Sequence, residues 1–343
     1  MTILSIAAET GFSKSTVHRA LSGDSNVSKK TAEIIRKYAT ECGYEPNLQA
    51  QALVGAPTYL TAILLPNLRT IEYVQMLRGA ERTAEKNGYS ILVFSSEDNQ
   101  QREMDMLSRI KRHGVQGMLV AAIDGVFDIL FSRLDELKIP CVGIYKSNFR
   151  NADLVESNIE AGAILAVRHL LKLGHRRIGF ITIDQPSDIS IPIKLRGYRK
   201  ALQDAGIEFR PEFVGGNEKL YSFDAGYKAT MAMLQLPEPP TAFFVLCDRL
   251  AVGVADAIHD FGLKIPEDIS LVGYDNKDFS QVMRPPLTTI KEQIYEIGVA
   301  GMELLLEKIK SPSKKKAQHV LFTPQLVVRG TCVSIKNKTK RGK

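Results

Sequence analysis

The sequence contains only four cysteines among 343 residues, and they lie far apart. No two of them form a Cys-x-x-Cys pair, and no histidine accompanies them at metal-ligand spacing. Zinc sites and disulfide frameworks need clustered or regularly spaced ligands, so neither is expected. We therefore expect no bound metal, and free thiols at Cys42, Cys141, Cys247 and Cys332.

Long hydrophobic runs are also missing. No apolar stretch reaches the roughly 18 to 20 residues of a membrane helix, and the first residues lack the features of an export signal. These absences predict a cytoplasmic protein without membrane contact. The 44% hydrophobic and 24% charged content is typical of a globular chain, and 343 residues suit a small head with a larger body.

Cofactor and catalytic signatures are absent as well. No Gly-x-Gly-x-x-Gly follows an expected strand and no Walker lysine motif occurs, so no nucleotide cofactor is expected. No Ser-His-Asp or Cys-His arrangement is recognisable, although residues distant in sequence can meet in space. An enzyme, such as an oxidoreductase, is therefore a disfavoured alternative that steady turnover of a bound ligand would revive.

The net charge of +7 is a weak sign of nucleic-acid binding, because of where the charge lies. Five basic residues and no acid occur in 336–343, which leaves only +2 for the rest of the chain. The first 58 residues carry six basic side chains against five acidic ones. Gross charge therefore does not establish DNA binding, and we expect 335–343 to be a disordered basic tail.

Three short helices are predicted in the first 46 residues. The first ends at Gly11, Ser13 can cap a second from Lys14 to about residue 21, and Ser28 can cap a third. The second helix should bury Val17, Ala20 and Leu21 and leave four polar side chains in solvent. Polar side chains near a helix N-terminus are what a recognition helix places in the major groove, and here they are Lys14, Ser15, His18 and Arg19.

Residues 47–53 follow Pro46, which favours an extended break. Seven residues are too few to hold a helix alone in water, so we expect this segment to order only on DNA. An alanine-rich linker is the alternative.

From residue 60 the chain alternates short apolar runs with amphipathic stretches. This alternation predicts repeated βαβ units, parallel sheets and a Rossmann-like doubly wound architecture. The strands are expected at 60–65, 90–94, 117–122, 140–144, 177–183, 241–246 and 270–274, with helices such as 72–87, 161–173 and 248–261.

Several motifs resemble those of the lactose-repressor (LacI/GalR) family of bacterial regulators. In the head they are TI and SIA at 2–7, GFSKSTVHRAL at 11–21, VS at 27–28, Thr31 and GYEPN at 43–47. In the body they are GHRRI at 174–178, PEDISLVGYD at 266–275, PPLTTI at 285–290 and VRG at 328–330. The resemblance implies a helix-turn-helix head and a two-lobed body of the periplasmic-binding-protein type.

The resemblance also implies domain boundaries. The head is expected at 1–46, a hinge helix and linker at 47–58, and the effector-binding and dimerisation domain at 59–334. Lobe 1 would take about 59–157 and 290–320, and lobe 2 about 158–289 and 321–334. The chain would then cross between the lobes near residues 157, 289 and 321.

In the head, the resemblance places Lys14 and Ser15 at the principal base-reading positions and Arg19 at a further base or phosphate contact. His18 stands where the family usually has serine, so a tolerated solvent-side residue is an equal alternative. Leu53 matches a leucine that wedges into the minor groove, which kinks the duplex. The full DNA-binding set implied is Ser13, Lys14, Ser15, Thr16, His18, Arg19, Asn47, Ala50 and Leu53.

In the body, effectors of such folds lie at the carboxyl ends of strands, between the lobes. The positions implied are Glu72, Tyr73, Tyr145, Lys194, Tyr221, Cys247 and Asp275. Tyr145, Lys194 and Cys247 replace the usual aspartate, arginine and asparagine, so the pocket departs from the common sugar-binding set. For Asp275 the alternative is a turn-capping role, and His175 is interpreted as structural.

Together these features predict a homodimeric transcription regulator, most simply a repressor, that binds a palindromic operator. A small-molecule effector, a sugar or related metabolite, would control it through the angle between the lobes. The alternative is a cytoplasmic sugar-binding protein that binds no DNA, which ligand binding without a DNA footprint would favour.

Overall fold

The computed structural model describes residues 2–22, 26–44, 57–121, 127–145, 152–186, 188–311 and 316–335. The chain divides into two compact units, Met1–Thr58 and Tyr59–Lys343, and each is considered by itself. Within the described ranges, no helix is long and apolar enough to cross a membrane.

The first unit contains the three predicted helices, α1 (Ile3–Thr10), α2 (Lys14–Ser22) and α3 (Lys29–Glu41). Their starts are capped by hydroxyls, because Ser13 Oγ accepts from Thr16 N at 3.1 Å and Ser28 Oγ accepts from Thr31 N at 3.1 Å. Gly11 ends α1 with a φ of 74°, as expected for a glycine C-cap. The helices share a small apolar core of Ile6, Val17, Ala20, Ala32, Ile35 and Ala39.

Lobe 1 of the second unit is a six-stranded parallel sheet in the order β11-β5-β4-β3-β1-β2. Its strands are β1 (Leu60–Leu65), β2 (Ser90–Ser95), β3 (Met118–Val120), β4 (Cys141–Tyr145), β5 (Leu154–Ser157) and β11 (His319–Phe322). Its helices are α5 (Ile71–Lys86), α6 (Gln100–Arg112), α7 (Phe127–Glu136) and α12 (Ile294–Lys310). Over the described part of the predicted strand at 117–122, β3 pairs only over three residues, and residue 122 lies outside the described residues.

Alternate strand residues of lobe 1 point to opposite faces of the sheet. Ile63 and Leu65 pack with α5 and α12, whereas Ala62 and Leu64 pack with α6 and α7. Because both faces are buried, the strands read as continuous apolar runs, which is why they were visible in the sequence.

Lobe 2 is a second six-stranded sheet in the order β12-β10-β9-β8-β6-β7, parallel except for β12. Its strands are β6 (Ile178–Ile181), β7 (Val214–Gly215), β8 (Ala242–Val245), β9 (Ser270–Tyr274), β10 (Thr288–Lys291) and β12 (Gln325–Val327). Its helices are α8 (Ile159–Lys172), α9 (Ser190–Asp204), α10 (Phe223–Leu234) and α11 (Asp248–Asp260).

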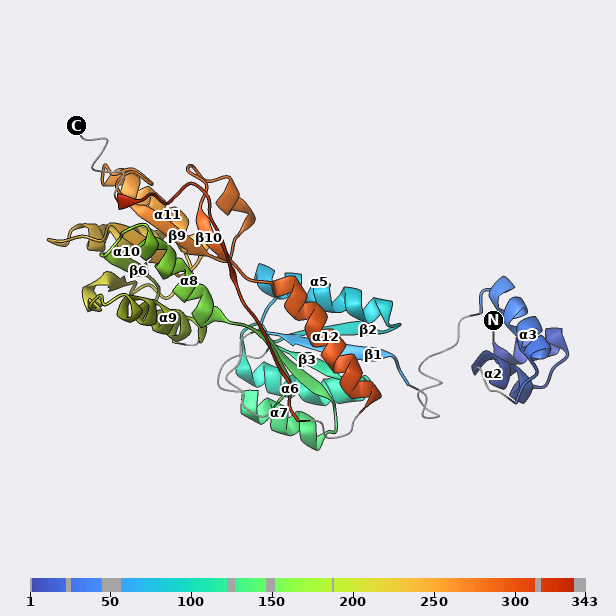
Figure 1. The fold of residues 1–343 in the computed structure, drawn as a ribbon. Helices are drawn as coiled ribbons and strands as arrows, with labels where there is room; N and C mark the ends of the chain where they lie inside the picture. Colours follow the sequence, from blue (N-terminus) through green and yellow to red (C-terminus); the bar gives the residue numbers. More distant parts are fainter. Residues whose placement is uncertain are drawn as a thin grey trace. The chain divides into compact units, whose positions relative to one another are not determined.

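Helices also cover both faces of the lobe 2 sheet (Figure 1). Phe180 stacks on Tyr198 of α9 with ring centroids 5.6 Å apart, and on Phe244 at 5.0 Å. Phe243 points the other way, toward Met233 of α10, and Gly179 lies beside both of these side chains. The predicted doubly wound, parallel two-lobed fold is confirmed.

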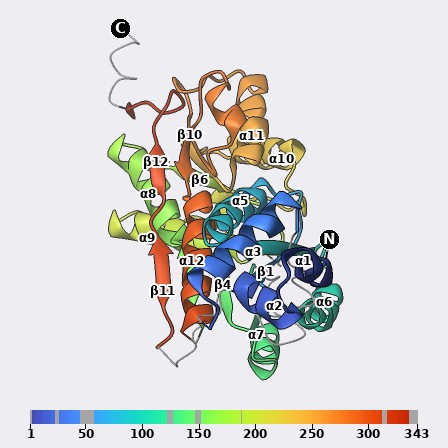
Figure 2. The same ribbon diagram turned by 90° about the vertical axis from the view of Figure 1, so that its right-hand side faces the viewer.

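The chain crosses between the two sheets three times: between β5 and α8, between β10 and α12, and between β11 and β12. In Figure 2, β11 and β12 follow one another along one extended segment that runs from lobe to lobe. Ile335 still belongs to lobe 2, because its N donates to Leu173 O at 2.9 Å. The rest of the predicted tail, 336–343, lies outside the described residues.

Helices α5 and α12 lie side by side on lobe 1 (Figures 1 and 2). Two glycines permit this contact. A β-carbon on Gly79 would overlap the carbonyl of Tyr295, and one on Gly298 would overlap the carbonyl of Met76. The backbones of the two helices therefore approach at positions that only glycine can fill.

Replacing Gly79 with alanine should lower the free energy of unfolding by about 1–3 kcal/mol, because overpacking forces the two helices apart. Urea denaturation of both proteins would measure this change. Arg82→Ala, on the exposed side of the same helix, is the matched control and should change stability by less than about 0.5 kcal/mol. Equal stability of the two variants would contradict the close approach.

Candidate functional site

Helix α2 presents a polar surface opposite the head core. Val17 and Ala20 are buried, whereas Lys14, Ser15, His18 and Arg19 are exposed, as predicted. Ser13 Oγ lies within hydrogen-bonding distance of Ser15 Oγ (2.9 Å) and Thr16 Oγ1 (2.8 Å), so the first turn is held by its own hydroxyls. Arg36 of α3 donates from Nε to Ala20 O at 3.2 Å, which fixes the other end of α2.

The exposed positions of α2 are spaced as i, i+1, i+4 and i+5, so they lie on one side of the helix. This surface can offer a flexible ammonium, hydroxyls, an imidazole and a guanidinium to an acceptor-rich partner. The predicted hinge residues Asn47, Ala50 and Leu53 lie outside the described residues.

Three candidate effector residues lie at the carboxyl ends of lobe 1 strands. Glu72 and Tyr73 begin α5 after β1, and Tyr145 ends β4 with a φ of 81°. The rings of Tyr73 and Tyr145 meet edge to face, with centroids 5.8 Å apart and planes at 86°. Burial raises the pKa of Tyr145, and the negative charges of Glu292, Glu72 and Asp275 raise it further.

Lys194 lies on α9 and is only 5% exposed. Its Nζ donates to Leu246 O at 2.8 Å and lies 3.5 Å from the centroid of the Tyr274 ring. The Lys194 ammonium is therefore held by a carbonyl oxygen and by the face of an aromatic ring. These two contacts fix the position from which its other N–H groups can donate.

Asp275 follows β9 directly and is partly buried, with a φ of 106°. Its N donates to Ile290 O at 2.8 Å, which holds the residue beside β10. Burial raises the pKa of the Asp275 carboxyl well above its usual value, while Lys194 and Lys277 act in the opposite direction. A positive φ at a non-glycine residue is strained, and such strain is common at ligand sites.

Cys247 and Tyr221 are the two remaining candidate effector residues of lobe 2. Burial raises the pKa of the Cys247 thiol to about 12, so the group is a neutral thiol near pH 7. The Tyr221 hydroxyl donates to Asp188, a residue that the sequence did not single out. Burial, followed by the charge of Asp188, raises the pKa of Tyr221, with smaller effects from Cys247 and Asp275.

Electrostatic interactions link the two lobes at this place. Asp275 of lobe 2 interacts with Glu72 of lobe 1, and Tyr145 of lobe 1 interacts with Asp275. The structure therefore brings the seven candidate effector residues into one interacting group at the carboxyl ends of both sheets, and we call the region between the lobes where they meet the interlobe cleft. It is lined by Glu72, Tyr73, Tyr145, Lys194, Tyr221, Cys247 and Asp275.

Lys277 is a cleft residue that the sequence reasoning missed. Its Nζ forms an ion pair with Glu72, which joins lobe 2 to lobe 1. Burial opposes the charge of Lys277, but Asp275 and Glu72 raise its pKa overall. The only sequence signal was its position two residues after Asp275; the pairing itself spans 205 residues.

Asp248 is a second missed residue, and its carboxylate is fully buried at the start of α11. It accepts hydrogen bonds from Lys277 N at 2.9 Å, Ser280 Oγ at 2.5 Å and Thr289 Oγ1 at 2.6 Å. These bonds fix the loop that follows Asp275. A β-carbon on Gly273 would overlap the Asp248 carboxylate, so the glycine makes room for it.

His175 has the structural role that the sequence predicted. It is fully buried, and its ring nitrogens lie 3.0 Å from Thr241 Oγ1 and 2.9 Å from Ser270 Oγ. Nε2 also lies 3.2 Å from Val333 O, so the ring joins β6, β8, β9 and the last segment of lobe 2. It is not in the interlobe cleft.

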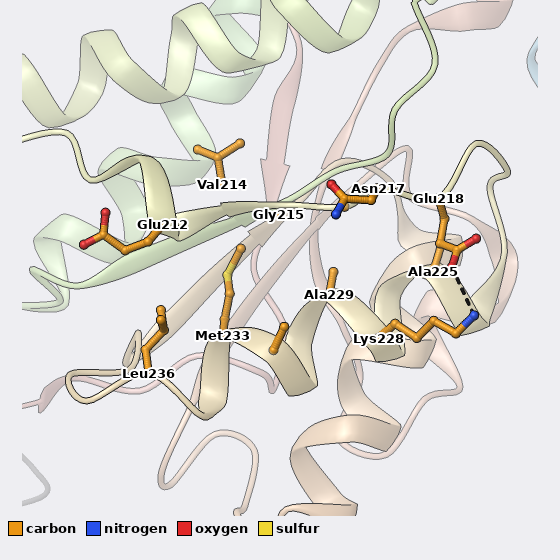
Figure 3. A pocket seen from close by; sticks show the side chains of 12 residues that line it. Glu212, Val214, Gly215, Asn217, Glu218, Ala225, Lys228, Ala229, Met233 and Leu236 are labelled. Atoms are coloured by element: carbon orange, nitrogen blue, oxygen red, sulfur yellow. Dashed lines mark hydrogen bonds and ion pairs between the residues drawn. The ribbon is translucent and has the colours of Figure 1, made fainter.

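A separate cavity of about 410 Å³ lies at the β7 edge of lobe 2, under α10 (Figure 3). Met233 and Leu236 line one part of it, and the Lys228–Glu218 ion pair, 3.0 Å long, closes another. None of the seven candidate effector residues lines this cavity. No group of three or more His, Cys, Asp or Glu side chains in the described ranges is placed to hold a metal ion.

Known proteins match both parts of the chain. Residues 2–47 match the family described as bacterial regulatory proteins, lacI family, and 167–332 match the periplasmic binding protein-like domain. Catabolite control protein A of Priestia megaterium is 30% identical over 315 residues, 89% of this chain and 91% of that protein. The HTH-type transcriptional repressor CytR of Escherichia coli K12 is 31% identical over 338 residues, 96% of each chain.

A solved structure agrees with these matches. The lac repressor dimer bound to operator and the anti-inducer ONPF superposes with a TM-score of 0.84 and 27% identity, over 97% of this chain and 99% of that chain. Both regions, the head and the two-lobed body, are thus found together in the relatives. The chain belongs to the lacI family of bacterial DNA-binding regulatory proteins.

Proposed function

We propose that this protein represses transcription from a palindromic operator as a homodimer, and that an effector in the interlobe cleft controls its operator affinity. The observation that carries the proposal is the meeting of seven polar and aromatic side chains between two lobes of a chain with a lacI-family head. Similar proteins are described as repressors, including one solved on its operator with a ligand. A regulator of bacterial DNA acts in the cytoplasm, where that DNA is.

We propose the predicted division of the chain for these tasks: residues 1–46 read DNA, 47–58 form the hinge, and 59–334 bind the effector and dimerise. A dimer with two-fold symmetry requires matching half-sites, which is why the operator should be palindromic. The protein acts by binding and catalyses no reaction. Support comes from the matched relatives, which are regulators, and from Cys247, whose buried thiol is not ionised.

The control mechanism follows from what joins the lobes. An effector that binds differently to two lobe arrangements shifts the equilibrium between them. The Lys277–Glu72 ion pair is one interlobe contact that such an effector would displace or reinforce, because it lies among the proposed contacts. Since the hinge segment leads into β1 of lobe 1, a change in lobe orientation can reach the DNA-binding head.

Lys14→Ala should weaken operator binding by about 1–3 kcal/mol, roughly 5- to 150-fold, because it removes a base-reading donor from α2. Binding to labelled operator at fixed salt would measure the loss. Lys37→Ala, an exposed position on α3, is the control for the loss of one positive charge and should have a smaller effect. Equal losses would show that α2 does not read bases.

Leu53→Ala should lower operator affinity at least about tenfold and leave weak binding to unrelated DNA unchanged. The reason is that the proposed minor-groove wedge acts only when the hinge is ordered on the operator. Parallel titrations with operator and scrambled duplex would separate the two effects. Unchanged operator affinity would exclude the wedge.

Asp275→Asn should abolish the response to effector. Thermal unfolding of the wild-type protein against sugars, sugar phosphates and nucleobases would first identify a stabilising ligand, which at about 100 times its Kd contributes roughly 2.7 kcal/mol. The shift should disappear in Asp275→Asn and persist in Asp278→Asn, an exposed neighbour on the same loop. If both variants retain the shift, Asp275 does not bind the effector.

A further inference from the structure

Glu292 is a buried carboxylate that the proposed effector set does not include. It lies in the second lobe crossing, just after β10, and is 8% exposed. Its Oε1 is buried and finds no hydrogen-bond partner among the described residues. Such an oxygen is costly unless a donor reaches it, because a buried charge loses its hydration.

The position of Glu292 is fixed by the strands on either side. In the parallel pairing of β10 with β9, Ile290 is opposite Tyr274, so Glu292 lies two residues further along, at the same carboxyl end of the sheet where Asp275 follows β9. Its negative charge raises the pKa of both Tyr145 of lobe 1 and Tyr274 of lobe 2, after the larger effect of burial. Glu292 therefore lies at the carboxyl end of β10, within electrostatic reach of a tyrosine in each lobe.

A second unpartnered group lies at the first lobe crossing. Ser157, the last residue of β5, is 6% exposed, and its Oγ has no hydrogen-bond partner in the described part of the chain. The preceding residue, Glu156, pairs in register with Tyr145. Both crossings thus contain a buried polar atom that has no hydrogen-bond partner among the described residues, and a bound ligand is one explanation for such atoms.

The charges at the cleft are unequal. The carboxylates that act on the candidate effector residues are those of Glu72, Asp188, Asp275 and Glu292, and the ammonium groups named there are those of Lys194 and Lys277. Glu72 is paired with Lys277, and Asp188 accepts the Tyr221 hydroxyl. Glu292 forms no ion pair with any cation among the described residues, so a positive charge brought by the ligand would be compensated there.

The tyrosine rings in the interlobe cleft also favour a positively charged ligand. Tyr73 and Tyr145 meet edge to face at the cleft, and their faces can attract a cation. One cation–π contact is already present in the structure, because the Lys194 ammonium lies over the Tyr274 ring. Carboxylates beside tyrosine rings form a setting for an ammonium group, whereas a phosphate would meet excess negative charge.

We propose that the effector is an amino sugar, whose protonated amine pairs with Glu292 and whose hydroxyl groups bond to Asp275 and Lys194. This inference rests on the proposed effector site and adds the ligand class and a specificity-determining residue. Glu292 accordingly separates an amine-bearing ligand from its neutral counterpart, because only the amine supplies the missing cation.

The test is thermal unfolding and calorimetric titration of the full chain with D-glucosamine, D-galactosamine and D-mannosamine, alongside the parent hexoses, their N-acetyl derivatives and hexose 6-phosphates. At least one free amino sugar should raise the melting temperature by several degrees and bind at least tenfold more tightly than its parent and its N-acetyl form. Glu292→Gln should reduce that preference at least tenfold. Glu303→Gln, an exposed position on α12, should leave it intact.

The unliganded melting temperature of each variant shows whether it is folded, and Glu292→Asp, which retains the charge, should keep part of the preference. Failure of all three amino sugars to bind would overturn the inference, as would a neutral or phosphorylated sugar that binds equally well. In either case an operator complex that responds to another ligand would leave the proposed function standing. Loss of operator binding by the unaltered protein would instead contradict the proposed function.

Discussion

The buried carboxylate of Asp248 is the interaction on which the lobe 2 side of the cleft depends. Three donors, from Lys277, Ser280 and Thr289, converge on it, and they belong to the loop and strand that follow Asp275. A buried carboxylate is tolerated when its oxygens accept enough hydrogen bonds. Here the donors belong to the loop and the next strand, so the same hydrogen bonds also hold the loop in place. Burial nevertheless raises the pKa of Asp248, because the hydrogen bonds from Ser280, Thr289 and Lys277 only partly offset the cost of burying the charge.

The same loop provides the contact between lobes. Its backbone is fixed by Asp248 and its Lys277 side chain reaches Glu72, so one residue connects the rigid interior of lobe 2 to the first helix of lobe 1. Arg329 holds the other side of the loop, through bonds to Leu287 O at 2.7 Å and Asn276 Oδ1 at 2.6 Å. A ligand in the cleft would therefore act on a loop that is already stiff, and its binding energy could be transmitted to lobe orientation.

Parallel sheets explain why the cleft lies where it does. All the lobe 1 strands and five of the six in lobe 2 run in parallel, so their carboxyl ends collect at one edge of each sheet. The three crossings join those edges, and Ser157 and Glu292 lie at two of these crossings. The cavity at the β7 edge of lobe 2 is a separate feature, because none of the seven candidate effector residues lines it.

The sequence by itself determined the local structure and most of the candidate site. Caps such as Ser13 and Ser28, together with continuous apolar runs, set the helices and strands because these signals act over a few residues. Only the tertiary structure decided which charges meet. The Lys277–Glu72 pair joins residues 205 positions apart, and the burial of Glu292 Oε1 without a hydrogen-bond partner among the described residues arises only in the packed chain. Neither can be read from spacing, since burial and pairing are properties of the packed chain.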